Sequence, residues 1–185
     1  LDVAYAVSPN FLMTLRNFCK KQKEDFFLVG ESPRDDYPFL LERMDSVTNY
    51  QAYKGIWSSL NSLNLYEIAS TYRRQFNEML PGSHLFSFLD NHDVTRIASM
   101  IENPQHLYLA YGLLMAMPGI PCIYYGSEWG EEGVKEKGVS DDNLRPYFEK
   151  PMGNDLTLAV KHLIWLRRGH PAFADGDYRE VFLTN

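Results

Sequence analysis

Short apolar runs alternate along this chain with segments of helical periodicity, and this alternation limits the folds open to it. Residues 1–4 read as the end of a strand, and further strands are predicted at residues 26–29, 45–49, 85–89 and 120–125. Helices are predicted after Ser8, near residues 38–43, and over residues 65–76, 104–117 and 155–169. Alternation of this kind predicts βα units around a parallel sheet, either doubly wound or closed as a barrel.

Acidic side chains gather at one kind of place in this pattern. Four of them lie at or just after the carboxyl end of a predicted strand: Asp2, Glu31, Asp93 and Glu128. Doubly wound sheets and barrels both build their active sites at that edge. The chain has no GxGxxG fingerprint and no GxxxxGK[ST] loop, which disfavours the nucleotide-binding versions of these folds.

Three of these acids suit the cleavage of a glycosidic bond. Departure of the sugar oxygen needs a protonated acid, attack on the anomeric carbon needs an ionised carboxylate, and the cationic transition state gains from nearby negative charge. The apolar residues 26–29 predict a raised pKa for Glu31, whereas Asp93 lies beside Asn91 and His92, which can bind substrate hydroxyls. Each acid alone also fits a plainer role, as a loop acid or a helix cap.

Composition narrows the partners. The net charge of −6 argues against a nucleic-acid partner, because such proteins neutralise phosphates with a basic face. No apolar run approaches the roughly 20 residues that span a bilayer, so no membrane partner is expected. Cys19 and Cys122 are interpreted as small buried hydrophobes rather than as a disulfide or metal ligands. The compartment stays open.

The aromatic residues near the predicted strand ends have two interpretations. Tyr124 and Tyr125 suit either sugar stacking or core packing, because the inner side of a barrel also needs bulky residues. Trp129 follows a predicted strand and can line a cleft, whereas Trp165 lies in a predicted helix and is expected to pack in the core.

Five motifs resemble, in the same order, those of the α-amylase family of glycoside hydrolases, and they spread over most of the chain. They are LDVA (residues 1–4), FLVGES (27–32), FLDNHD (88–93), GIPCIYYGSEWG (119–130) and SDDNLRP (140–146). Within the family, MDSVTNYQAYKGI (44–56) and SDDNLRP look like the neopullulanase and cyclomaltodextrinase branch. The segment VAYAV after Asp2 lacks the Lys-His pair of many α-amylases.

The resemblance implies an α-glucan substrate and retaining double displacement. It makes Asp2 the nucleophile, Glu31 the general acid and base, and Asp93 the stabiliser of the transition state. The first two carboxyl groups are then expected to lie roughly 5 to 5.5 Å apart. Substrate-binding roles follow for four residues, the last two near the non-reducing side of the cleft: Asn91, His92, Asp141 and Arg145. No cofactor is expected here, and calcium, which is common in the family, is left to the full-length enzyme.

The resemblance also implies an incomplete fold. Residues 1–175 are expected to form the C-terminal half of a TIM (β/α)8 barrel, from the end of strand four through helix eight. Residues 176–185 are expected to be a linker and the start of a truncated C-terminal β-domain. Half a barrel exposes sheet edges and an apolar face, so we expect an inactive fragment that forms a homodimer through these faces.

Two other functional classes remain open. A non-catalytic amylase-like barrel would serve in carbohydrate binding or protein interaction, and such relatives typically lose one carboxylate, whereas all three are present here. A barrel enzyme for phosphorylated substrates would need a glycine-rich phosphate loop before a helix, which the sequence lacks. Hydrolysis and transglycosylation cannot be separated by sequence.

Overall fold

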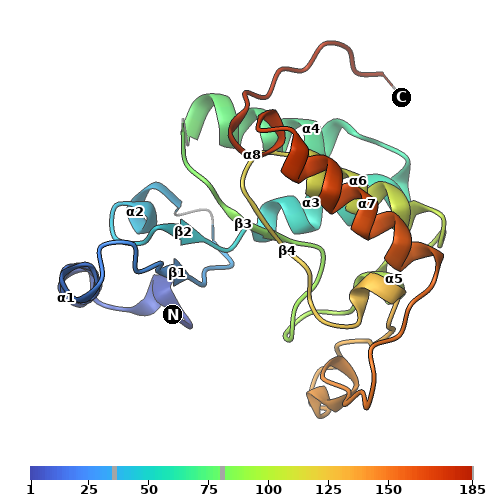
Figure 1. Cartoon of the computed structure of the whole chain (residues 1–185), viewed down its shortest axis with the longest axis horizontal. Helices are drawn as coiled ribbons and strands as arrows, with labels where there is room; N and C mark the ends of the chain where they lie inside the picture. Colours follow the sequence, from blue (N-terminus) through green and yellow to red (C-terminus); the bar gives the residue numbers. More distant parts are fainter. Residues whose placement is uncertain (35–36, 80–81, 185) are drawn as a thin grey trace.

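Four short parallel strands run side by side through the computed structural model, which describes residues 1–34, 37–79 and 82–184 (Figure 1). In chain order they are β1 (Val29–Gly30), β2 (Ser46–Val47), β3 (Phe86–Phe88) and β4 (Ile120–Cys122). β1 pairs with β2 and β3 with β4, and a bridge from Thr48 to Phe86 places β2 next to β3. The predicted α/β class with parallel strands is confirmed, and over the described ranges the sheet does not close into a barrel.

All the predicted strands but the first are present, and each is shorter than expected. Phe26 and Phe27 lie outside β1 and are 41% and 52% exposed, so the apolar run before Gly30 is not a buried strand throughout. Residues 1–4 do not form a strand. Instead the chain turns at Val3, which has a φ of 42°, and enters a 3-10 helix, Ala4–Ala6.

Helices supply most of the regular structure. They are α1 (Pro9–Gln22), α2 (Tyr37–Leu41), α3 (Tyr50–Ser62), α4 (Tyr66–Arg73), α5 (Ile97–Met100), α6 (His106–Ala116), α7 (Asp155–Gly169) and α8 (Ala172–Asp175). A π-helix (Arg74–Met79) continues α4, and two 3-10 helices, Ser127–Trp129 and Asp141–Leu144, follow β4. At the start of α7, Asn154 and Thr157 form a capping box, where the sequence predicts the helix to begin.

Sequence reasoning missed α3. Its Asn49 cap accepts a hydrogen bond from the backbone N–H of Ala52, and Ile56 and Leu60 are buried on its inner face. The segment contains three aromatic residues, three serines and Gly55, all of which have lower helix propensity than alanine. Burial against the neighbouring helices and β3 outweighs that propensity.

Two clusters of buried apolar residues hold these elements together. The larger one joins α3, α4, α6 and α7, which Figure 1 shows on one side of β3 and β4. The smaller one lies among α1, α2, β1 and β2, with Leu12, Leu40 and Val47 at its centre. The helical spacing of α1 predicts Phe11, Leu12 and Phe18 on one face, but Leu12 is buried whereas Phe11 and Phe18 are 54% and 61% exposed. No helix in the described ranges is long and apolar enough to cross a membrane.

Residues 176–184 form neither helix nor strand, so this part of the chain contains no strand of the β-domain whose start was expected there. They lie against α4 and the π-helix. Tyr178 packs on the rings of Tyr72 and Phe76, and Arg73 forms an ion pair with Glu180. The division of the chain near residue 175 stays a prediction.

A partly buried carboxylate, that of Asp45, ties α1 to the start of the sheet and allows a test of stability. Asp45 accepts from the Leu28 N–H at 2.8 Å and pairs with Arg16 and Lys20, each at 3.0 Å. Burial alone would raise its pKa, but these three partners outweigh burial and lower it. We expect Asp45→Ala to reduce the free energy of unfolding by ~1–3 kcal/mol, because it leaves the Leu28 N–H unpaired.

The same carboxylate predicts the direction of acid sensitivity. A lowered pKa in the folded state means that its contribution is full above about pH 4 and is lost as the pH falls further. Denaturant unfolding at pH 7 and at pH 3 checks this. Asp25→Ala is the matched control, because Asp25 is 79% exposed and its pair with Lys23 contributes little. Equal losses in the two variants would contradict the assignment.

Candidate active site

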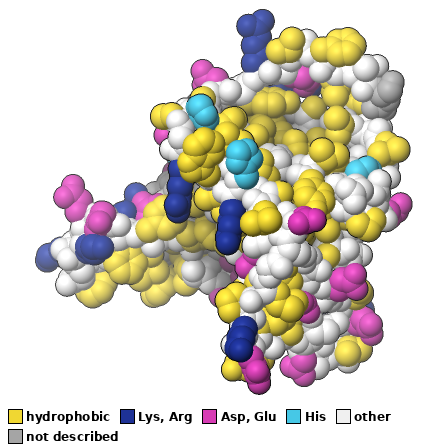
Figure 2. Space-filling view, turned by 45° about the vertical axis from the view of Figure 1, so that its right-hand side comes forward, with side chains coloured by type: hydrophobic (Ala, Val, Ile, Leu, Met, Phe, Trp, Pro, Cys, Tyr) yellow, Lys and Arg dark blue, Asp and Glu magenta, His cyan; other side chains and the backbone are white. Residues whose placement is uncertain are grey.

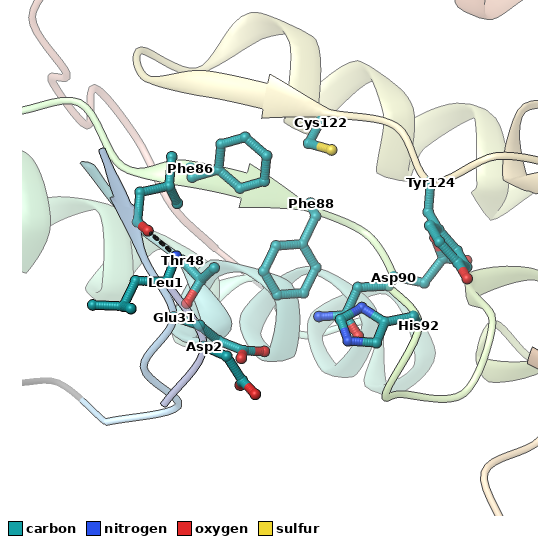
Figure 3. A pocket seen from close by; sticks show the side chains of 12 residues that line it. Leu1, Asp2, Glu31, Thr48, Phe86, Phe88, Asp90, His92, Cys122 and Tyr124 are labelled. Atoms are coloured by element: carbon teal, nitrogen blue, oxygen red, sulfur yellow. Dashed lines mark hydrogen bonds between the residues drawn. The ribbon is translucent and has the colours of Figure 1, made fainter. Parts of the chain in front are cut away.

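A cavity of about 470 Å³ opens at the carboxyl ends of the strands. Figure 3 shows Asp2 and Glu31 on one side of it, His92 and Asp90 on the other, and the ring of Phe88 between them. It therefore collects side chains from three separate strand ends, as the sequence predicts for an active site in a parallel α/β fold. Its polar and aromatic lining includes Asp2, Glu31, Asp90, Asn91, His92 and Tyr124.

Backbone hydrogen bonds set Asp2 beside Glu31. The Leu1 amino group donates to the carbonyl of Val29 at 2.7 Å, and the Glu31 N–H donates back to the carbonyl of Leu1 at 2.9 Å. The Ala4 N–H then donates to the Glu31 carbonyl at 2.9 Å. Although residues 1–4 are not a strand, these bonds align the chain along β1 as a parallel neighbour would. Two carboxyl groups far apart in sequence thus enter the same cavity.

The surroundings of Glu31 favour its protonated form. Burial raises the pKa of this carboxyl, a side-chain hydrogen bond with Asp2 raises it further, and the Tyr50 hydroxyl acts in the opposite direction. The negative charges of Asp2 and Asp93 add to the upward shift. A carboxyl group with a raised pKa next to a second carboxylate is the arrangement that supplies one proton donor and one anion.

Tyr50 is a site residue that the sequence did not indicate. It is the first residue of α3, and its hydroxyl donates to Glu31 Oε1 at 3.2 Å and accepts from Asn91 Nδ2 at 2.9 Å. Burial raises the pKa of this phenol to about 12, so it stays a proton donor at neutral pH. The hydroxyl therefore links the end of β1 to the end of β3. No signal for it was available while α3 itself was unpredicted.

The loop after β3 carries Asn91, His92 and Asp93. Asn91 Oδ1 accepts from the Asp93 N–H at 2.8 Å, which closes an Asx turn and sets the direction of the loop. His92 lines the cavity, and its Nε2 lies 3.5 Å from Asp93 Oδ2. Asp93 is not part of the cavity lining, its side chain is 45% exposed, and Arg145 Nη2 lies 3.1 Å from its Oδ1.

Asp141 and Arg145 lie outside the cavity wall, next to Asp93. Arg145 Nε donates to the His92 carbonyl at 3.3 Å, and Arg145 Nη2 lies 3.7 Å from Asp141 Oδ2. A hydrogen bond from Lys135, at 2.7 Å, lowers the pKa of Asp141. The structure therefore places Arg145 against Asp93 and Asp141 beside Arg145. Lys135 is a further partner of Asp141 that sequence reasoning missed.

The comparisons with known proteins agree with this geometry. The family described as "Alpha amylase, catalytic domain" matches residues 7–183. The chain belongs to the α-amylase family. It is 30% identical to a maltogenic α-amylase of Bacillus acidopullulyticus over 95% of this chain and 30% of that protein, and 28% identical to a cyclomaltodextrinase of a Bacillus species over 100% and 33%. The predicted resemblance to the cyclomaltodextrinase and neopullulanase branch is confirmed.

A solved α-amylase family structure gives the same fold. The crystal structure of an Anoxybacillus α-amylase superposes with a TM-score of 0.80 and 28% identity, covering 94% of this chain and 40% of that one. The chain spans about a third of the length of the curated relatives it matches. The comparisons therefore show a partial α-amylase catalytic domain, which is the coarser part of the prediction of half a TIM barrel.

The aromatic residues divide differently from what was expected of them. Tyr124 lines the cavity and also lies under a buried arginine, whereas Tyr125 is 43% exposed and bonds the Pro146 carbonyl. Trp129 lines a separate hollow beside α7, not the cavity with Glu31. Trp165 was expected to pack in the core, but it is 67% exposed and stacks on His162.

The remaining acid of the sequence pattern, Glu128, acts locally. Its Oε2 accepts from the Gly126 N–H at 2.8 Å, within the turn after β4. Within the described ranges, no group of three or more His, Cys, Asp and Glu side chains is arranged so that it could hold a metal ion.

Proposed function

We propose that the natural protein carrying this chain cleaves, or transfers, α-1,4-glucosidic bonds of starch-type oligosaccharides or polysaccharides by retaining double displacement. The observation that carries the proposal is the pair formed by Asp2 and Glu31 in one cavity, with the pKa of Glu31 raised by burial and by its neighbour. Membership of the α-amylase family supports the substrate class.

Each carboxyl group takes a role that suits its surroundings. Asp2 attacks the anomeric carbon as an ionised nucleophile while Glu31, protonated, donates its proton to the departing sugar oxygen. Water or a sugar hydroxyl then gives its proton to the Glu31 carboxylate and displaces Asp2, which restores both groups. Asp93 lies close enough to influence Glu31, and its charge stabilises the cationic transition state.

The rest of the lining binds the sugar. His92 and Asn91 offer ring nitrogens and an amide to sugar hydroxyls, and Tyr124 offers an aromatic face inside the cavity. Arg145 and Asp141 lie on the far side of Asp93, where the next sugar of a chain would leave the cavity. This set recognises a neutral, hydroxyl-rich ligand.

The stereochemistry of the first product tests the mechanism. Proton NMR of maltooligosaccharide cleavage is expected to show the α-anomer first, before mutarotation, because two displacements at one carbon restore its configuration. Initial release of the β-anomer would overturn double displacement. Absence of any cleavage or transfer would favour an amylase-like module that only binds carbohydrate.

The Tyr50 hydroxyl gives a prediction about pH. Its hydrogen bond lowers the pKa of Glu31, so Tyr50→Phe is expected to raise that pKa further. Because Glu31 must be protonated to act as the acid, the alkaline limb of kcat/KM against pH should move to higher pH. Tyr147→Phe is the control, because Tyr147 is 88% exposed. A limb that moves to lower pH, or not at all, would contradict the assigned hydrogen bond.

We further propose that the exposed apolar faces associate with a second copy of the chain. On the lobe formed by α1 and β1, four phenylalanines are 41–61% exposed: Phe11, Phe18, Phe26 and Phe27. Figure 2 shows hydrophobic side chains along the lobe that projects at the left. Contiguous apolar surface of this kind marks an association site. Sedimentation of the chain is expected to give a dimer at micromolar concentration, and a stable monomer would overturn this.

A further inference from the structure

Arg96 lies beneath the candidate site and is fully buried. Its Nη1 donates to the Tyr125 carbonyl at 2.6 Å and to Ser127 Oγ at 3.1 Å, and its Nη2 donates to the Leu144 carbonyl at 2.7 Å. The guanidinium also lies 4.1 Å from the centroid of the Tyr124 ring. One side chain therefore contacts two segments that follow β4: the turn that contains Tyr125 and Ser127, and the end of the short helix Asp141–Leu144.

Both segments bond part of their backbone internally, since the Ser127 N–H donates to the Tyr124 carbonyl and the Arg145 N–H to the Asp142 carbonyl, whereas Arg96 bonds the carbonyls of Tyr125 and Leu144. Buried carbonyls without a partner are costly, and a planar guanidinium can serve several acceptors at fixed angles. Leu144 ends the short helix Asp141–Leu144, and the next residue is Arg145, which contacts Asp93. The bond to the Leu144 carbonyl thus holds the backbone one residue away from the contact with a proposed site carboxylate.

Asp90 balances the buried charge and fixes the orientation of the guanidinium. It is 2% exposed, and its Oδ2 accepts from the Ile97 N–H at 2.7 Å. The Ser127 hydroxyl lies 2.8 Å from both Asp90 oxygens, so it bridges the carboxylate and Arg96. Asp90 directly precedes the loop of Asn91, so the network is anchored on the same loop that carries the site.

A close backbone contact adds to this constraint. The Arg96 N–H donates to the Gly133 carbonyl at 2.8 Å, and a Cβ on Gly133 would lie 2.5 Å from the Asn143 carbonyl oxygen. Gly133 and Leu144, the two ends of the segment that carries Lys135 and Asp141, are therefore both bonded to Arg96, and Lys135 binds Asp141 within that segment.

We propose that Arg96 is a positioning residue, which holds the loop of Arg145 and the ring of Tyr124 in register with the loop that carries Asp93. It acts through these residues and not on the substrate. The effect on turnover rests on the proposed function, whereas the effect on the loop does not.

The chain contains a matched control. The Arg96 guanidinium donates to two backbone carbonyls and one hydroxyl, and the Arg167 guanidinium donates to three backbone carbonyls, those of Met115, Met117 and Gly119, at the C-terminal end of α6, away from the cavity. Arg96→Lys and Arg167→Lys each keep the positive charge and lose the planar guanidinium that donates several hydrogen bonds at fixed angles. Ser127→Ala is a milder second variant, which removes the hydroxyl that bridges Arg96 and Asp90 and keeps the guanidinium.

Two measurements on the natural polypeptide that carries this chain test the proposal. In hydrogen exchange, Arg96→Lys and, less strongly, Ser127→Ala are expected to speed exchange over residues 133–148 by about tenfold, while Arg167→Lys leaves that segment unchanged. In kinetics on maltooligosaccharides, Arg96→Lys is expected to lower kcat/KM by about 100-fold, and Arg167→Lys to leave it within about twofold.

The outcomes are distinguishable. Equal exchange over residues 133–148 in the two arginine variants would overturn the proposal, and so would faster exchange with unchanged kcat/KM. A wild-type protein without glucan cleavage or transfer would instead overturn the proposed function, and the exchange pattern would still decide whether Arg96 holds the loop.

Discussion

Replacing Glu31 with glutamine is expected to lower kcat on maltooligosaccharides by about 10²- to 10⁴-fold, with little change in KM. Glutamine keeps the size and the contact with Tyr50 but cannot donate a proton to the departing oxygen. The loss is therefore confined to the transition state. Steady-state kinetics in the natural polypeptide measures it, and Glu24→Gln is the control because Glu24 is exposed after α1.

The leaving group separates this role from a structural one. An aryl maltooside with a good leaving group needs no proton, so its first step should survive in Glu31→Gln and the glycosyl-enzyme intermediate should accumulate. Added azide, which needs no general base, should then release the α-maltooligosyl azide and raise turnover. A variant with equal losses on both kinds of substrate, and no response to azide, would remove Glu31 from the acid and base role.

A larger loss is expected from Asp2→Ala. Without its carboxylate no covalent intermediate can form, and kcat should fall by about 10⁴-fold or more. Azide can enter the vacated space and attack the anomeric carbon once, so the expected product is a β-maltooligosyl azide of inverted configuration. The two variants thus give azide products of opposite configuration, which assigns nucleophile and acid independently of rate.

Asp25→Ala, at an exposed position, is the control for this experiment. It should leave kcat unchanged. If Asp2→Ala kept more than about a tenth of the wild-type kcat, Asp2 would not be the nucleophile.

Much of the fold was predictable because local signals and burial agree. The helix that follows Ser8 and the helix that Asn154 caps were both predicted from the residues at their boundaries. The exposed phenylalanines of α1 and the missed α3 show the limit. In both cases tertiary contacts decide which face is buried, and periodicity alone does not contain that information.

The candidate site was predictable in its members and not in its connections. The motif order indicated Asp2, Glu31, His92 and Asp93, and the structure brings them to one edge of the sheet. The roles remain predictions. Tyr50, Lys135 and the network around Arg96 escaped because each acts through partners at least 6 residues away in sequence. Such contacts exist only once the loops are folded.

The two parts of the candidate site are held by different contacts, and this has a consequence for how relatives of this chain diverge. The proposed nucleophile and acid are aligned by the backbone along β1, whereas Arg145, Asp141 and Lys135 belong to a segment that Arg96 contacts. Under the proposed function, bond cleavage and chain recognition thus depend on different parts of the polypeptide. We therefore expect sequence drift in residues 133–148 to alter which glucans fit while the proposed cleavage chemistry is retained.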